Sequence, residues 1–216
     1  MDILFVIIGI VGFALSIIIH EVAHGYVADK LGDPTARLSG RLTLNPFPHI
    51  DLYGTVLVPF LLFFFHSPFL FGWAKPVPID PFNLKNPKKD AALISLAGPA
   101  ANIISAVLLA VFLRILLMVF PTQAIFSLFY NLIRFNVILA IFNLIPIHPL
   151  DGGKILVGFL PDKEARQFDA FLNRFGMLLL FFLIFPVFGG TSLISPIMSP
   201  IINFLLRILI PGFSTI

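Results

Sequence analysis

Two histidines and a glutamate stand together near the start of this 216-residue chain, in the stretch His20-Glu21-Val22-Ala23-His24. On a helix, residues four positions apart lie one turn apart on the same face, so His20 and His24 could bind one metal ion. Glu21 would then lie beside the metal, where its carboxylate could accept a proton from a bound water. The spacing predicts a zinc centre of the kind that hydrolases use.

A catalytic zinc ion takes three protein ligands and leaves a fourth position for water. The chain contains no cysteine, so the third ligand must offer nitrogen or oxygen. Most aspartates lie in polar segments or near the chain ends, where solvated positions are expected. Asp151 differs, because it directly follows an apolar stretch and lies between Pro149 and the pair Gly152-Gly153. Since two glycines let the backbone pass close to another element, Asp151 is predicted to complete a site for one Zn²⁺ per chain.

The elements that must position these residues are membrane helices. The chain is 58% hydrophobic and 12% charged, which is typical of a polytopic membrane protein, and its net charge of +3 is too small to indicate nucleic-acid binding. The first apolar run, Ile3–Ile19, leads directly to His20. An ionised group at that depth costs about 2.5–3.5 kcal/mol on insertion scales, so ordinary packing does not explain two histidines and a glutamate there. Five further charge-free stretches could cross much or all of the bilayer: Leu52–Ala74, Ala91–Leu113, Ile115–Ile133, Phe135–Leu150 and Phe175–Leu206.

The pattern predicts an all-α polytopic membrane protein with a small membrane-dipping β-strand region. For Asp151 to reach the depth of the histidines, an even number of complete crossings must separate them, so Leu52–Trp73 is expected to re-enter and turn at His66-Ser67-Pro68. This predicts five full transmembrane helices plus one re-entrant segment, with six full spans as the alternative. The expected order within a single domain over 1–216 is a first helix at 1–28, a re-entrant and strand region at 33–80, helices at 91–153, and C-terminal helices at 154–216.

Basic residues gather at one end of this predicted arrangement. They lie in the loops on the side where the first helix ends: Lys30, Arg37, Arg41, Lys75, Lys85, Lys88, Lys89, Lys154, Lys163, Arg166 and Arg174. By the positive-inside rule this side is the cytoplasm. The chain is therefore predicted to be a multi-pass protein of a prokaryotic cell membrane, with its metal site toward the cytoplasmic side.

Three motifs carry a resemblance to a known family: HEVAH at 20–24, Gly-Pro-x-x-Asn at 98–102, and Asn-x-x-Pro-x-x-x-Leu-Asp-Gly-Gly at 143–153. Together they resemble the site-2 protease family of intramembrane zinc metalloproteases, in its compact form without PDZ or CBS domains. The resemblance implies that His20, His24 and Asp151 bind zinc and that Glu21 is the general base. It also implies that Asn143 binds the substrate backbone or stabilises the oxyanion, and that the substrate is a transmembrane protein within the bilayer.

Several roles stay open at the level of sequence. Asn102 could contact substrate or form a hydrogen bond between helices, and His148 could assist the zinc site, contact substrate or serve only in its turn. An unwound substrate could pair with a strand edge at 33–50 or 72–79. A metal transporter and a catalytically silent, substrate-binding relative are the alternative functions. A transporter would spread polar residues through several spans, whereas here they gather at 20–24 and 143–151. The oligomeric state is not indicated.

Overall fold

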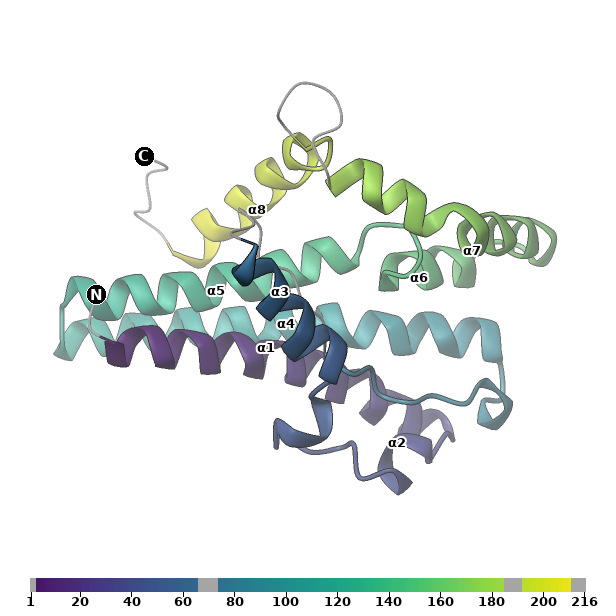
Figure 1. Ribbon diagram of the computed structural model, residues 1–216, viewed down its shortest axis with the longest axis horizontal. Coiled ribbons are helices and arrows are strands. Elements are labelled where there is room, and N and C mark those ends of the chain that lie inside the picture. Colours follow the sequence, from purple (N-terminus) through teal and green to yellow (C-terminus); the bar gives the residue numbers. More distant parts are fainter. Residues whose placement is uncertain (1–2, 66–73, 185–191, 211–216) are drawn as a thin grey trace.

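The computed structural model describes residues 3–65, 74–184 and 192–210, and its regular elements are helices (Figure 1). The long helices are α1 (Ile3–Leu31), α4 (Pro87–Val119), α5 (Gln123–Asn143) and α7 (Asp162–Ile184). Shorter elements connect or follow them: α2 (Thr35–Leu38), η1 (Phe47–His49), η2 (Leu52–Leu57), α3 (Val58–Phe64), η3 (Pro81–Asn83), α6 (Asp151–Phe159) and α8 (Ser195–Leu209).

Helices α1, α4 and α5 form the central bundle and lie side by side, with α4 running opposite to the other two (Figure 1). Small residues allow α4 to pack closely, because Ala106 and Ala110 are fully or nearly fully buried against Ile133 and Val137 of α5. The inner face of α8 closes the same core. This order of directions brings the end of α5, and the turn that follows it, back to the half of the bundle that contains His20 and His24.

Among the described residues, four helices are long and apolar enough to cross a membrane: α1, α4, α5 and α7. The chain is thus a multi-pass membrane protein, but the prediction of five full spans plus a re-entrant segment is wrong. Helix α7 already begins at Asp162 and joins a charged first half to an apolar second half. Helix α8 has 15 residues, about 22 Å of helix against a hydrocarbon layer of about 30 Å. The alternative of six full transmembrane spans is not supported either, since four such helices are found among the described residues.

The predicted β-strand region at 33–80 is also wrong, since the described residues of this region form short helices, turns and an extended segment without strand pairing. Residues 74–80 are extended, but Pro76 and Pro78 have no N–H to donate along one edge. On the other edge, the N–H groups of Lys75 and Val77 donate to the His49 carbonyl and to a side chain of α1. The donors of residues 75–78 are therefore unavailable for a ladder, and residues 33–50 contain no strand. Substrate docking by strand pairing is thus not supported for the described residues of the two predicted segments, 33–50 and 72–79.

The apolar stretch after Asp51 starts a helix that is too short to span. The Asp51 carboxylate accepts hydrogen bonds from the N–H groups of Tyr53 and Gly54, which caps η2, a π-helical turn that continues into α3. Helix α3 ends at Phe64. The predicted turn at His66-Ser67-Pro68 lies outside the described residues.

Candidate metal centre

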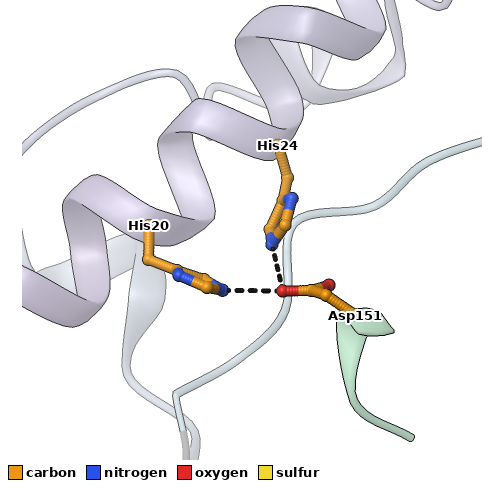
Figure 2. Close-up of side chains that lie close together, drawn as sticks. All are labelled: His20, His24 and Asp151. Carbon is orange, nitrogen blue, oxygen red and sulfur yellow. Dashed lines mark hydrogen bonds and ion pairs between the residues drawn. The ribbon is translucent and has the colours of Figure 1, made fainter. Parts of the chain in front are cut away.

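Three side chains converge inside the bundle, two from α1 and one from the first residue of α6 (Figure 2). The Asp151 carboxylate oxygen Oδ2 lies 3.1 Å from His20 Nε2 and 3.3 Å from His24 Nε2. Both histidines are buried, and the Asp151 side chain is 13% exposed. Among the described residues this is the group of histidine and acidic side chains that could hold a metal ion.

The sequence around Asp151 explains how that residue reaches the histidines. Helix α5 ends at Asn143, and the following proline-containing turn folds back so closely that a Cβ on Gly152 would lie 2.3 Å from the carbonyl oxygens of Leu144 and Ile145. Any other residue at position 152 would push the turn and the start of α6 apart. The glycine thus lets α6 begin in close contact with the turn that follows α5, with Asp151 aimed at the histidines of α1 (Figure 2).

The second nitrogen of each histidine has a hydrogen-bond partner that determines its tautomer. His20 Nδ1 lies 2.6 Å from Asn102 Oδ1, and His24 Nδ1 lies 2.7 Å from the carbonyl oxygen of Ile94. The Asn102 amide nitrogen already donates to the Ser16 carbonyl, so its oxygen faces His20. Since both partners are acceptors, each histidine carries its proton on Nδ1 and presents the lone pair of Nε2.

Two imidazole lone pairs and a carboxylate oxygen that face one another repel unless a cation lies between them. Zinc bonds of about 2.0–2.2 Å in a tetrahedron separate ligand atoms by about 3.4 Å, close to the distances at Asp151. Gly98 of α4 leaves room at this point, because a Cβ there would lie 2.5 Å from His24 Nε2 and 2.6 Å from His20 Nε2. The donor set, its spacing and the missing side chain at position 98 therefore fit Zn²⁺.

Glu21 is held by the backbone of the extended segment 74–80. The N–H of Val77 donates to Glu21 Oε2 at 3.0 Å. No other described residue donates a hydrogen bond to this carboxylate, so Oε1 is available to a ligand. Glu21 follows His20 directly in α1, so this proton acceptor is one residue away from a predicted metal ligand.

The two asparagines of the predicted site have different surroundings. Asn102 is completely buried and bonds to His20, Ser16 and Asn136, so its contacts join helices. Asn143 is partly buried, and its amide donates to the Leu139 carbonyl of its own helix at 3.0 Å. The substrate or oxyanion role of Asn143 stays a prediction, since its amide group is turned toward α5 here.

His148 connects the turn before Asp151 to α7. Its Nε2 lies 2.9 Å from Asp169 Oδ1, and a Cβ on Gly176 of α7 would lie 2.4 Å from the His148 carbonyl oxygen. The ring is partly buried and belongs to the packing between this turn and α7. This contact does not reach the three converging side chains.

Asn136 and Ser16, which were not predicted to be site residues, extend the polar contacts of His20 to α5. Asn136 is 1% exposed and its amide donates to Ser16 Oγ at 2.9 Å and to the Leu132 carbonyl at 2.9 Å, while its oxygen accepts from Asn102. The signal was present, because an asparagine inside an apolar membrane helix needs a polar partner. The identity of that partner could not be predicted.

Comparisons with known proteins find one family model and several curated relatives of this chain. A model of Peptidase family M50 matches residues 117–183, which include Asp151. The chain is 36% identical over 202 residues to "Putative zinc metalloprotease YwhC" of Bacillus subtilis (strain 168), covering 90% of this chain and 85% of that protein. It is 30% identical over 175 residues to "Putative zinc metalloprotease Rip2" of Mycolicibacterium smegmatis, covering 81% of this chain and 65% of that protein. "Zinc metalloprotease MJ0392" of Methanocaldococcus jannaschii is 27% identical over 152 residues, which are 69% of this chain and 33% of that protein. No solved structure matches.

Proposed function

Because this chain belongs to peptidase family M50 and is a zinc metalloendopeptidase, we propose that it cleaves peptide bonds in or near the transmembrane segments of other membrane proteins. Membership of the site-2 protease family and the use of zinc, both predicted from the motifs, are confirmed. The location of the three converging side chains supports the intramembrane substrate. His20 lies in the eighteenth position of the 29-residue helix α1, about 16 Å along the axis from the helix end at Leu31.

We assign the metal to His20, His24 and Asp151, because these side chains present three lone pairs to one point. Bound zinc supplies a Lewis acid that brings the pKa of a water ligand to about 7. The Nδ1 hydrogen bonds to Asn102 and Ile94 keep both imidazoles in the tautomer that leaves Nε2 free.

Glu21 is the proposed general base. With Oε2 held by the Val77 N–H, its Oε1 can take the proton of the attacking water and later deliver it to the leaving nitrogen of the cleaved bond. Asn143 could stabilise the developing negative charge once its amide leaves the Leu139 carbonyl. Glu21 thus acts on the reacting atoms, while Asn102 acts only through His20.

A pair of glutamine variants tests this assignment, because the chain has only two glutamates, Glu21 and the exposed Glu164. The purified protein, in detergent with a model transmembrane substrate, is expected to show cleavage that a zinc chelator abolishes. Glu21→Gln should bind zinc normally and cleave about 10²–10⁴-fold more slowly. Glu164→Gln should match the unchanged protein. Normal cleavage by Glu21→Gln, or zinc flux across vesicles without cleavage, would refute the proposal.

We also propose that the metal centre faces the cytoplasm. The loops at the end of α1 and the starts of α4 and α7 contain most of the basic residues. This distribution supports a cytoplasmic location by the positive-inside rule. A reporter inserted after Asn83 should give a cytoplasmic signal in cells, and a periplasmic signal would overturn this orientation.

A further inference from the structure

The peptide unit between Pro76 and Val77 is held at both of its ends. Its N–H donates to Glu21 Oε2 at 3.0 Å, and its carbonyl oxygen accepts from Arg41 Nη2 at 3.1 Å. The bond is not among the cis peptides of the chain, so its C=O and N–H point in opposite directions within one rigid plane. Arg41 and Glu21 are therefore connected through a single planar group.

Arg41 is an unusual residue to find in this position. It is 6% exposed, and Nη2 also donates to the Lys75 carbonyl oxygen at 2.6 Å. Among the described residues no carboxylate lies within ion-pair distance of this guanidinium, and its buried Nε has no hydrogen-bond partner. Burial of a cation without an anionic partner is costly, so packing alone does not account for Arg41.

The neighbours of Val77 make its N–H the single donor of this part of the segment. Pro76 and Pro78 have no N–H, and their rings restrict the backbone to extended conformations. The Lys75 N–H donates to the His49 carbonyl at 2.9 Å, which holds the backbone in place just before Pro76. The segment can thus offer Glu21 one hydrogen bond, and the orientation of that bond depends on the peptide plane that Arg41 holds.

We propose that Arg41 is a positioning residue for Glu21, acting through the Pro76–Val77 peptide unit. The cation on the carbonyl oxygen fixes the plane and polarises the N–H, which then orients the Glu21 carboxylate and leaves Oε1 directed at the substrate water. Arg41 touches neither metal ligands nor reacting atoms. The inference rests on the proposed role of Glu21 as general base.

Removing the Val77 N–H tests the last step of this connection. Val77→Pro lacks the donor and suits an extended segment, and Val77→Ala measures the loss of the side chain alone. Relative to Val77→Ala, Val77→Pro is expected to lower kcat by about 10- to 100-fold, the range for a hydrogen bond to a charged group, with KM and zinc content unchanged. Ile79→Pro is the matched control, because the Ile79 N–H donates to no described residue; its kcat should stay within about twofold of the unchanged protein.

A double-mutant cycle tests whether Arg41 acts through that N–H. Arg41→Met should lower kcat by about tenfold in the unchanged protein and by less than about twofold in Val77→Pro, because the group through which it acts is then absent. Arg41→Lys, which keeps the charge, should restore part of the loss. If the effects of Arg41→Met and Val77→Pro multiply, Arg41 has only a structural role and the inference is overturned.

The outcomes separate this inference from the proposed function. Cleavage by Glu21→Gln at the normal rate would remove the general base and both claims with it. If Glu21→Gln is inactive but the effects of Arg41→Met and Val77→Pro on kcat multiply, only the role of Arg41 is refuted. If Arg41→Met does not fold, as judged by its thermal unfolding, the cycle with Arg41→Lys decides by the same criterion.

Discussion

Replacement of Asn102 by alanine should weaken zinc binding through His20. Asn102 Oδ1 is the acceptor for His20 Nδ1, at 2.6 Å in a fully buried position. Without it the ring can turn, or move its proton to Nε2, where it would block the metal. Loss of such a partner typically costs 10- to 100-fold in metal affinity. The zinc Kd should therefore rise by about this factor, which equals about 1.4–2.7 kcal/mol.

Asn136→Ala is the control that separates this effect from lost stability. Asn102 forms three hydrogen bonds, to His20, Ser16 and Asn136. Asn136 also forms three, to Asn102, Ser16 and Leu132. At about 0.6 kcal/mol for each hydrogen bond in a membrane protein, both variants should lose about 2 kcal/mol of unfolding free energy. Only the Asn102 variant loses the acceptor of His20.

Competition with a chelator of known zinc affinity, on protein in detergent micelles, measures Kd for both variants, and thermal unfolding measures their stability. We expect similar unfolding temperatures, a Kd raised about 10- to 100-fold for Asn102→Ala, and a Kd within about threefold of the unchanged protein for Asn136→Ala. Equal zinc affinities for the two variants would show that Asn102 contributes only to packing between helices and does not determine the tautomer of His20.

Two further predictions concern the space for the metal and the loop after α1. Gly98→Ala should reduce bound zinc to below about a tenth, because its Cβ would lie within 2.6 Å of the Nε2 atoms of both His20 and His24, although alanine itself favours the helix. Gly9→Ala is the control, since its Cβ would lie 3.9 Å from the nearest side chain, and it should retain zinc. A metal analysis of the purified proteins measures both. Normal zinc in Gly98→Ala would place the metal elsewhere. Burial raises the pKa of Asp33, but hydrogen bonds from Thr35 and Asn83 outweigh it and lower that pKa overall. The ionised carboxylate thus stabilises the fold above the unfolded pKa of about 3.9, and this contribution disappears as the pH falls through the lower folded value. Asp33→Asn should therefore unfold at lower temperature than the unchanged protein at pH 7, and the difference should shrink below about pH 4; a difference independent of pH would contradict this account.

The expectation that Asp33, like most aspartates, occupies a solvated position was wrong for a physical reason that bears on the whole 33–80 region. Asp33 is completely buried and accepts from the N–H of Asp80 at 2.7 Å, which joins the end of α1 to the segment before α4. Side chains such as Asp33 and Arg41 hold this region together in place of strand pairing. Local alternation and prolines predicted extended backbone there, which residues 74–80 do adopt, but a strand also needs a partner with free donors and acceptors.

The sequence alone determined what depends on local spacing and composition. The membrane class follows from long charge-free runs, and the common direction of His20 and His24 follows from the helical repeat, which requires no knowledge of distant residues. Tertiary structure decided which groups meet across the bundle. Asn102 and Asn136 reach Ser16 from positions 86 and 120 residues away, and Arg41 reaches Glu21 through a peptide unit of another segment. Such contacts depend on how three helices and a loop pack together, and many packings are compatible with the same local pattern.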